Sequence, residues 1–309
     1  MKKPVPVTFE SKGANIHAIF YQASGVEPLP TVILCHGFPG NNTDVLGLGQ
    51  RLMTEGFNAL AFNYRGTWGS EGLYTDANAL EDVISTIRYL KSSSNVQEFN
   101  VDPSRITIIG YSYGGGMALL GSLNDAAVKR VVDLAGGNLS VLGRASDEFM
   151  RGLEKHVDQV ISDSGFRAPK ARELFAEMLT DVDKHDLVKH AQALSCKDIL
   201  IIGAWHDQEA DLENHILPLF RALQRHGAKQ LQIEIFDTDH EFTNVRSQLA
   251  DRIVSWLKRT PSTDTMARAA CVQFEWTGRD LNPRFPHCEC GVHTRLNYRP
   301  YLLSGRNVD

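Results

Sequence analysis

The chain has 309 residues, of which 42% are apolar and 22% charged, and this ordinary globular composition excludes a collagen, a coiled coil and a wholly disordered chain. Its 32 lysines and arginines stand against 37 aspartates and glutamates, which gives a formal net charge of -5. Because this balance provides no basic field to concentrate nucleic-acid phosphates, we expect no nucleic-acid partner.

The cysteines and the first residues indicate the compartment. There are five cysteines, an odd number, and only two of them precede residue 259. Secreted disulfide frameworks use even sets of cysteines, so a cytoplasmic location is expected. Residues 1–12 are too polar for a signal peptide, and no run approaches the roughly 18 apolar residues of a membrane span. We therefore expect no membrane segment.

The predicted elements begin with residues 5–22, whose alternating pattern favours two antiparallel strands. Beyond them, short apolar strands alternate with segments of helical periodicity. The predicted strands are 31–35, 58–62, 105–109, 129–134, 198–202 and 230–236, and the predicted helices are 44–55, 77–91, 115–123, 212–226 and 242–258. Such alternation implies crossover connections, and therefore an α/β fold with a mostly parallel central sheet and helices on both faces.

Residues 138–195 interrupt the alternation with helical periodicity, much charge and no convincing strand. We interpret them as a helical lid insertion over one edge of the sheet. Two ordinary crossover helices are the alternative. Residues 1–258 are then one domain that contains this insertion.

The last residues differ from the rest in composition. Residues 259–309 hold seven arginines and no lysine, whereas residues 1–258 hold 13 arginines and 12 lysines. They show no helical or strand period of useful length, so we predict a poorly ordered tail.

Two interpretations of that tail compete. Cys288 and Cys290, with a histidine on each side, could bind zinc, but they lack the paired C-x₂-C spacing of structural zinc folds. The run from Asp280 to Pro283 can instead be encoded by codons complementary to the T arm of a tRNA gene. We hypothesise a reading frame that has overrun into such a gene, which the nucleotide sequence would decide, and we predict no metal site.

The motif Gly110-Tyr111-Ser112-Tyr113-Gly114 lies between a predicted strand and a predicted helix. A G-x-S-x-G sequence at that junction is typical of a nucleophilic serine on a sharp turn, where larger side chains in place of the glycines would collide with neighbouring elements. A helix-capping serine or a phosphate-binding loop is the alternative. The glycine spacing fits neither G-x-G-x-x-G nor a Walker loop, so Ser112 is the predicted nucleophile.

A serine hydroxyl needs a general base, and the resulting imidazolium needs a carboxylate behind it. Asp207 follows the predicted strand 198–202, and His240 follows the predicted strand 230–236. Because the carboxyl ends of parallel strands open on one side of a sheet, these side chains can converge with Ser112. We predict Asp207 as the acid and His240 as the base.

Other residues compete for these roles. His206 adjoins the proposed acid, whereas five further histidines, at 156, 185, 190, 215 and 226, fall in predicted helices. Glu209 and Asp211 are close enough along the chain to be rival acids. Asp237 and Asp239 could reach His240 locally, although an aspartate in such a position is more often a turn former.

An oxyanion needs backbone N–H donors beside the nucleophile. The loop His36-Gly37-Phe38-Pro39-Gly40 follows the predicted strand 31–35. The N–H groups of Phe38 and Tyr113 are the predicted pair, because Pro39 has none to offer. His36 is predicted to organise the loop rather than to act as a second base.

These blocks resemble the α/β-hydrolase superfamily from about residue 5 to residue 258, in the chain order serine, aspartate, histidine. Residues 63–72 (NYRGTWGSEG) and 203–207 (GAWHD) are similar to loops of prolyl-oligopeptidase-like hydrolases and small esterases. The resemblance implies the α/β-hydrolase fold, a triad of Ser112, Asp207 and His240, and oxyanion donors at Phe38 and Tyr113.

The expected activity is that of a serine hydrolase that cleaves carboxylic esters through an acyl-enzyme, with no metal or organic cofactor. Only about 30 residues precede the predicted strand 31–35. We therefore do not expect the β-propeller that prolyl oligopeptidases carry before their catalytic domain. An aminopeptidase-like or acylaminoacyl-peptidase-like amide hydrolase, or a non-catalytic binding protein, is the alternative. We expect a small ester or short peptide as substrate, and an apolar acyl or aryl group beside the aromatic residues Phe38, Tyr111, Tyr113 and Trp205.

Overall fold

The computed structural model describes residues 3–40 and 44–259. The residues on which the zinc and read-through hypotheses for the tail depend lie outside this part of the chain. Arg259, assigned above to the tail, belongs to the domain, because its guanidinium bonds Asp198 at 2.6 Å and Gln230 at 3.0 Å. None of the described helices combines the length and the apolar character that crossing a bilayer demands.

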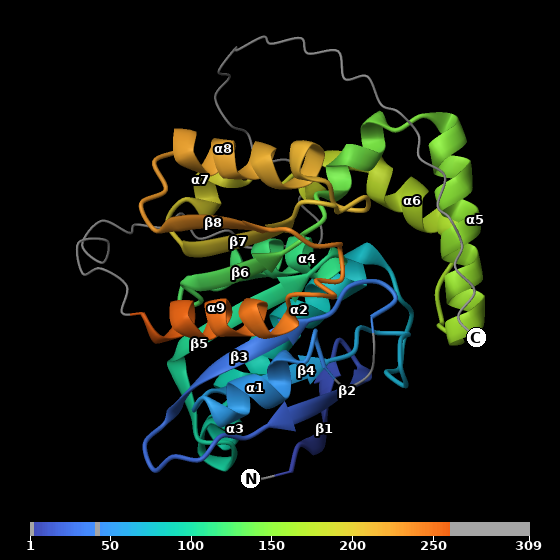
Figure 1. The fold of residues 1–309 in the computed structure, drawn as a ribbon. Helices are drawn as coiled ribbons and strands as arrows, with labels where there is room; N and C mark the ends of the chain where they lie inside the picture. The colour runs from blue at the N-terminus through green and yellow to red at the C-terminus, as the bar shows by residue number, and fades with distance from the viewer. Residues whose placement is uncertain (1–2, 41–43, 260–309) are drawn as a thin grey trace.

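A single eight-stranded sheet forms the centre of the molecule, in the order β1-β2-β4-β3-β5-β6-β7-β8 (Figure 1). Its strands are β1 (Val5–Ser11), β2 (Ala14–Tyr21), β3 (Leu29–Cys35), β4 (Asn58–Phe62), β5 (Val101–Tyr111), β6 (Arg130–Leu134), β7 (Asp198–Ala204) and β8 (Leu231–Phe236). The pairs β1–β2 and β2–β4 are antiparallel, and all the others are parallel. The prediction of a mostly parallel sheet with an antiparallel start is confirmed.

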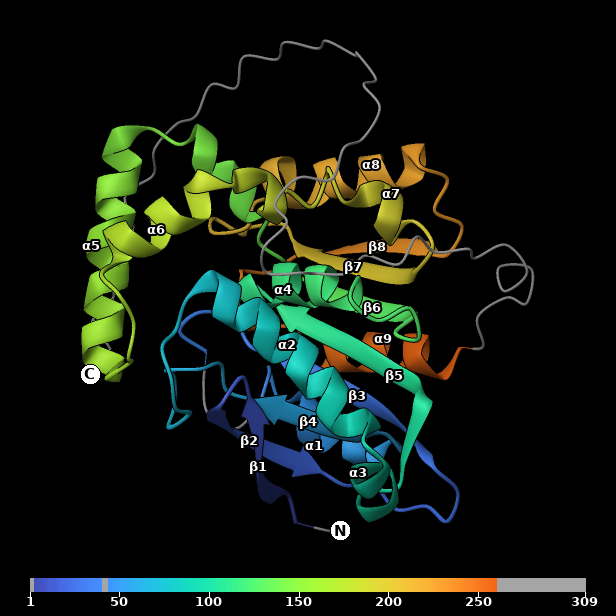
Figure 2. The same cartoon turned by 180° about the vertical axis from the view of Figure 1, so that it is seen from behind.

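Helices cover both faces of the sheet. The principal ones are α1 (Leu48–Thr54), α2 (Asp76–Lys91), α3 (Ser93–Glu98), α4 (Tyr113–Ser122), α8 (Leu217–Arg225) and α9 (Arg246–Lys258). Figure 1 shows α1 and α9 in front of the sheet, and the opposite view shows α2 and α4 on the other face (Figure 2). The α/β-hydrolase arrangement predicted from the sequence is therefore present.

Several element boundaries differ from the predictions: α1 begins four residues later than the predicted helix 44–55, and β5 begins four residues earlier than the predicted strand 105–109. The short helix α3 was not predicted, and α9 begins four residues later than expected. The predicted helix 212–226 is divided into a π-helical turn, η3 (Leu212–Ile216), and α8. Pro218 causes this division, because a proline lacks the N–H that a continuous helix needs and is tolerated only in a first turn.

The segment between β6 and β7 is helical, as predicted. It contains η1 (Leu139–Arg144), α5 (Asp147–Ser164), α6 (Ala171–Thr180), η2 (Val182–His185) and α7 (Ala191–Leu194). Figures 1 and 2 show α5 and α6 beyond the end of the sheet, whereas α7 lies beside α8. The N–H of Arg167 donates to the carbonyl of Gly66, and the N–H of Tyr74 donates to the carbonyl of Arg167. These bonds fix the segment to the loop that follows β4.

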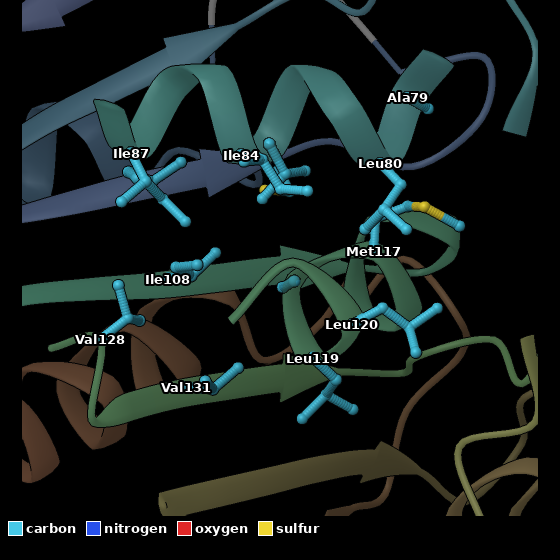
Figure 3. Close-up of a cluster of buried hydrophobic side chains, with 14 of the residues drawn as sticks. Ala79, Leu80, Ile84, Ile87, Ile108, Met117, Leu119, Leu120, Val128 and Val131 are labelled. Atoms are coloured by element: carbon cyan, nitrogen blue, oxygen red, sulfur yellow. The ribbon is translucent and has the colours of Figure 1, made fainter. Parts of the chain in front are cut away.

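The core is divided by the sheet into two layers. Figure 3 shows the layer in which Leu80 and Ile84 of α2 meet Met117 of α4 above Ile108 of β5. The second layer packs α1 and α9 on the opposite face. Residues 106–110 of β5 are buried and contain three isoleucines and no charged residue, and this short run identified the strand in the sequence.

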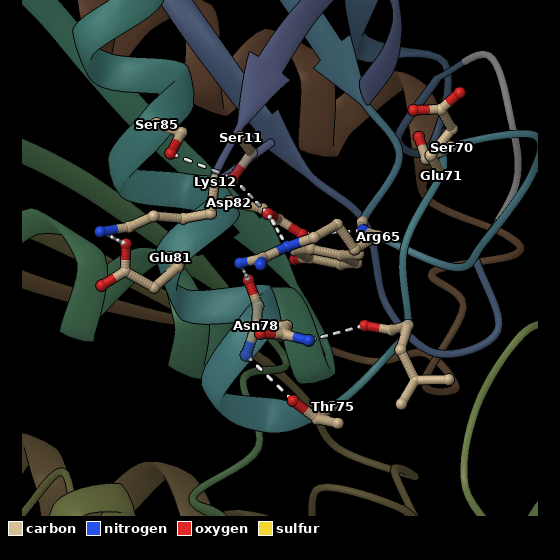
Figure 4. A network of polar contacts seen from close by, with 12 residues as sticks. Ser11, Lys12, Arg65, Ser70, Glu71, Thr75, Asn78, Glu81, Asp82 and Ser85 are labelled. Carbon is tan, nitrogen blue, oxygen red and sulfur yellow. Dashed lines mark hydrogen bonds and ion pairs between the residues drawn. The ribbon is translucent and has the colours of Figure 1, made fainter. Parts of the chain in front are cut away.

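A buried ion pair positions the loop after β4 (Figure 4). The fully buried Asp82 of α2 accepts hydrogen bonds from the backbone N–H and the Nε–H of Arg65, both at 2.7 Å, and from the Ser11 hydroxyl at 2.6 Å. The same loop carries Trp68, whose indole N–H donates to the carbonyl of Pro39 at 2.9 Å. The loop after β4 thereby supports the loop after β3, which holds the predicted oxyanion donor Phe38.

Candidate active site

Ser112 occupies a sharp turn between β5 and α4. Its backbone has φ 55° and ψ -125°, a conformation that non-glycine residues rarely adopt. Three backbone bonds hold it there: the Ser112 N–H donates to the carbonyl of Leu134, and the Ser112 carbonyl accepts from the N–H groups of Gly115 and Gly137. The turn thus presents the hydroxyl at the carboxyl edge of the sheet.

The glycines of the motif are required by close backbone contacts. A Cβ at Gly110 would lie 2.0 Å from the carbonyl oxygen of Gly114. A Cβ at Gly114 would lie 2.3 Å from the carbonyl oxygen of Cys35 and 2.5 Å from that of His36. Since these neighbours are backbone atoms of the turn and of β3, no side-chain rotation can relieve the clash.

Replacement of Gly114 by alanine is therefore expected to destabilise the fold by about 3 kcal/mol, because overpacking against a rigid backbone forces the helix and β3 apart. The free energy of unfolding from urea titration measures the change. Gly152→Ala is the matched control, since a Cβ at Gly152 on α5 would meet nothing within 4 Å. Equal stability of the two variants would contradict this account of the motif.

The structure brings the three predicted triad residues together. The Nε2 of His240 lies 2.9 Å from the Ser112 Oγ, and its Nδ1 lies 2.7 Å from Oδ2 of Asp207. An ionised carboxylate only accepts hydrogen bonds, so Nδ1–H donates to Asp207 and Nε2 accepts from the serine hydroxyl. The loops that carry the two partners are joined by a bond from the His206 N–H to the Thr238 carbonyl, 2.9 Å.

The electrostatics of the pair favour a charged aspartate and a basic histidine. Burial opposes ionisation of Asp207, but the hydrogen bond and charge of His240 and the backbone N–H groups of Ala210 and Glu209 outweigh it and lower the pKa of Asp207. Burial likewise opposes protonation of His240, but the hydrogen bond and charge of Asp207 outweigh it and raise the pKa of His240. The imidazolium is therefore stabilised at this position.

The predicted oxyanion donors lie on the two loops that meet at Ser112. A Cβ at Gly37 would lie 3.0 Å from the Ser112 Cβ, so the loop after β3 passes directly beside the nucleophile. Tyr113 is the first residue of α4, and the first N–H groups of a helix have no intrahelical acceptor. The N–H of Tyr113 therefore belongs to the residue that follows the serine in the chain. The N–H of Phe38 belongs to the loop after β3, beside the serine.

His36 stabilises its own loop. Its Nδ1 lies 2.6 Å from the carbonyl oxygen of Gly37, and burial lowers the pKa of the ring to about 4. The ring therefore stays neutral near pH 7 and donates its Nδ1–H to that carbonyl. This geometry agrees with the predicted organising role.

The rival acids and bases have other partners. His206 bonds the exposed Asp237 at 2.8 Å. Asp239 accepts from the N–H of Thr243, as a turn former does, and Asp211 caps η3 by accepting from the N–H of Asn214. Glu209 does approach His240, but at 3.5 Å from Nε2, the nitrogen that faces the serine. It therefore does not share the position of Asp207.

The predicted aromatic surroundings are correct only in part. Tyr111 lies beside His240, with 5.1 Å between the ring centroids, and Phe38 packs on Phe166 of the inserted segment. Trp205 instead is 66% exposed and lines an open hollow of about 590 Å³ beside β8, whose lining includes no triad residue. The backbone N–H of Trp205 donates to the Phe236 carbonyl at 2.8 Å, and a contact of its ring with an acyl group stays a prediction.

One polar contact near the site had no signal in the sequence. The Tyr113 hydroxyl donates to Asp76 at 2.9 Å, and burial raises the pKa of Asp76 to about 6. The pattern of residues 77–91 predicts only a helix, and an aspartate at a helix start suggests no more than a favourable interaction with the helix dipole. In the part of the chain described, no group of three or more histidines, cysteines or carboxylates is placed to hold a metal ion.

Several curated proteins share part of this sequence. The quorum-quenching protein AidA of Acinetobacter baumannii is 31% identical over 134 residues, which cover 42% of each chain. The juvenile hormone esterase of Heliothis virescens is 30% identical over 164 residues, 48% of this chain and 28% of the esterase. The aligned parts thus cover about half or less of the length of these relatives.

Solved structures share the fold at low identity. An esterase of Pyrococcus furiosus matches with a TM-score of 0.60 and 18% identity over 83% of this chain and 91% of its own. The acylaminoacyl peptidase of Pyrococcus horikoshii matches with a TM-score of 0.63 and 18% identity over 86% of this chain and 43% of its own. The model of the alpha/beta hydrolase family matches residues 32–255, which include both loops and all three triad positions. On this match and this fold, the chain belongs to the alpha/beta hydrolase family.

Proposed function

We propose that this protein is a serine hydrolase that cleaves carboxylic esters of small molecules, with Ser112 as nucleophile, His240 as general base and Asp207 as its orienting acid. The observation that carries the proposal is the pair of contacts at His240, 2.9 Å to the Ser112 Oγ and 2.7 Å to Asp207. A serine on a strained turn, hydrogen-bonded to a buried and oriented imidazole, is the arrangement of nucleophilic acyl transfer.

In the first half of the reaction, His240 Nε2 takes the hydroxyl proton as the Ser112 Oγ attacks the ester carbonyl carbon. The N–H groups of Phe38 and Tyr113 stabilise the tetrahedral oxyanion. The carbon–oxygen bond to the alcohol then breaks, and the alcohol leaves with the proton from Nε2. Water repeats these steps on the acyl-enzyme and releases the acid, so the chemistry needs no metal or organic cofactor.

The inserted helices are proposed to act as a lid within a catalytic domain of residues 1–258. Phe166, which follows α5, lies 6.1 Å from the Phe38 ring between centroids, and Phe38 also packs on Tyr74 at 5.3 Å. These rings give the oxyanion side of the site an apolar wall, which suits an apolar acyl group. The word esterase in the name of one curated relative supports the same substrate class.

Labelling with a fluorophosphonate probe tests the proposal. We expect one equivalent of probe on the peptide that contains Ser112, because the probe reacts with a serine activated by its histidine. Mass spectrometry of the digested protein locates the label. Absence of the label, or a label on another serine such as Ser122 of the same helix, would contradict the proposal.

A panel of p-nitrophenyl esters and aminoacyl anilides separates the ester reaction from the amide reaction. We expect kcat/KM to be higher for the esters, because an alkoxide leaves more easily than an amine. Faster turnover of the anilides would instead assign the site to an aminopeptidase-like or acylaminoacyl-peptidase-like activity.

A further inference from the structure

A second carboxylate reaches the reactive nitrogen of His240. Oε2 of Glu209 lies 3.5 Å from Nε2, the atom that also faces the Ser112 hydroxyl. The Glu209 side chain is 62% exposed, whereas that of His240 is 9% exposed, so the carboxylate lies at the open side of the histidine. Among the residues that the structure describes, no lysine or arginine lies within ion-pair distance of Glu209.

The backbone holds Glu209 in this place. Its N–H donates to Oδ1 of Asp207 at 2.8 Å, and the following N–H, of Ala210, donates to the same oxygen at 2.8 Å. The acid that orients His240 through Nδ1 therefore also fixes the residue that reaches Nε2. Glu209 is consequently part of the same rigid turn as the proposed triad.

The charges around His240 are mainly carboxylates, with one cation nearby: Arg246 of α9 donates its Nε–H to the carbonyl of Glu241 at 2.8 Å and lowers the pKa of the Tyr111 hydroxyl. Glu241 is the next residue in the chain, and its carboxylate, like that of Glu209, favours the imidazolium. The Tyr111 ring packs on His240, and burial together with the carboxylates of Glu209 and Glu241 raises the pKa of its hydroxyl, so the ring stays neutral. His215 of η3 accepts from the N–H of Asn138 at 3.0 Å, and burial lowers the pKa of its ring, which also interacts electrostatically with Asp207 and His240.

Proton transfer determines which part of a substrate meets this charge. In the proposed reaction the ester oxygen of the alcohol must accept the proton from Nε2–H as the carbon–oxygen bond breaks, so that oxygen lies within hydrogen-bond distance of Nε2. Glu209 is 3.5 Å from the same nitrogen. Substituents of the alcohol a few atoms beyond the ester oxygen therefore lie against the carboxylate of Glu209.

We propose, resting on the proposed ester hydrolysis, that Glu209 is a specificity-determining residue that favours esters whose alcohol part carries a positive charge. The carboxylate attracts a cationic alcohol and repels an anionic one, while the neutral acyl part lies on the aromatic side of the site. At this exposed position the attraction is modest and is screened by salt.

Two esters of the same shape test the proposal. Acetylcholine and 3,3-dimethylbutyl acetate share the acetyl group and differ in whether the branched atom is a charged nitrogen or a neutral carbon. For the wild type at low ionic strength we expect kcat/KM to be about fivefold higher for the cation. Glu209→Gln should bring the ratio of kcat/KM for the cationic ester to kcat/KM for the neutral ester close to one, because the uncharged amide keeps the side-chain size but does not attract the cation. A change in activity that is common to both esters cancels in this ratio.

Glu213→Gln is the matched control, because it removes the same charge from an exposed residue of η3 that forms no ion pair among the described residues. The control should keep the wild-type preference. A preference that is the same in the wild type and in Glu209→Gln, or one that Glu213→Gln removes equally, would overturn the proposal while leaving the hydrolase assignment intact. Failure of the wild type to hydrolyse either ester, together with no fluorophosphonate label at Ser112, would overturn both.

The pH profile supplies a second readout. Removal of the Glu209 carboxylate removes one of the charges that stabilise the imidazolium, so the pKa of His240 should fall and the acid limb of kcat/KM should move to lower pH. Asp207, Glu241, Tyr111 and His215 remain, so the limb should move without disappearing. An unchanged acid limb in Glu209→Gln would contradict the contact with Nε2.

Discussion

Ester hydrolysis by the Ser112→Ala variant is expected to show a kcat about 10⁶-fold below that of the wild type, because the substitution removes the only atom that can form the acyl-enzyme. The Ser112 Oγ is also the atom that His240 Nε2 contacts at 2.9 Å, so in the variant the base has no hydroxyl proton to accept. The strained backbone of residue 112 is held by bonds to Leu134, Gly115 and Gly137, which alanine keeps. The variant should therefore fold as the wild type does.

Initial rates with p-nitrophenyl acetate, and the melting temperature of both proteins, measure this result. Ser122→Ala is the matched control: this buried serine of the same helix bonds only the carbonyl of Leu119 in the described structure, at 2.7 Å, and its removal should leave kcat unchanged. A loss smaller than about 100-fold in Ser112→Ala would contradict the assignment of the nucleophile.

The Asp207→Asn variant is expected to lower kcat by about 10⁴-fold with little change in KM. Oδ1 of residue 207 accepts from two backbone N–H groups, so an asparagine would orient its oxygen toward them and its amide nitrogen toward His240. The amide donates to Nδ1, which moves the ring proton to Nε2. Nε2 then donates to the Ser112 hydroxyl and can no longer accept its proton.

Asp211→Asn controls for the loss of a carboxylate in the same loop. Asp211 caps η3 by accepting from the N–H of Asn214 at 2.7 Å, a function that asparagine also performs, so kcat should be retained. The pH profile of kcat/KM adds a second measure, since the pKa of His240 is held up by Asp207 and should fall in Asp207→Asn. A similar kcat in the two variants would contradict the role of Asp207.

The proximity of Ser112, Asp207 and His240 could be predicted because each of them follows an element that the sequence identifies by itself. The strands that precede Ser112 and Asp207 contain short buried runs rich in isoleucine, and the half-buried strand before His240 alternates apolar and polar residues. The carboxyl ends of these parallel strands meet at one edge. Gly110 and Gly114 added independent evidence, since a Cβ at Gly110 would meet the backbone of the turn itself and a Cβ at Gly114 would meet the backbone of Cys35 and His36. Periodicity and local sterics were therefore sufficient for this part of the site.

Contacts between loops could not be predicted in the same way. From the sequence, Glu209 was a rival of Asp207 for the role of the acid. The course of the turn after β7 places it near Nε2 of His240 rather than near Nδ1, and the sequence pattern does not predict this course. Trp205 was expected inside the site because of its apolar ring, but in the structure this ring is largely exposed and lines the hollow beside β8. Such choices depend on the orientation of single side chains, for which the hydrophobic pattern contains no information.

The position of the inserted helices has a consequence for how relatives of this protein can diverge. The segment enters after β6 and leaves before β7, two strands that are neighbours and buried, so its length does not affect the register of any strand pair. The segment packs Phe166 on Phe38 and contributes Leu174 and Leu187 to the core layer of α2 and α4, but none of the backbone bonds that hold Ser112 comes from it. Exchange of this inserted segment between homologues can therefore alter which substrates reach the site, while the elements that carry Ser112, Asp207 and His240 stay the same.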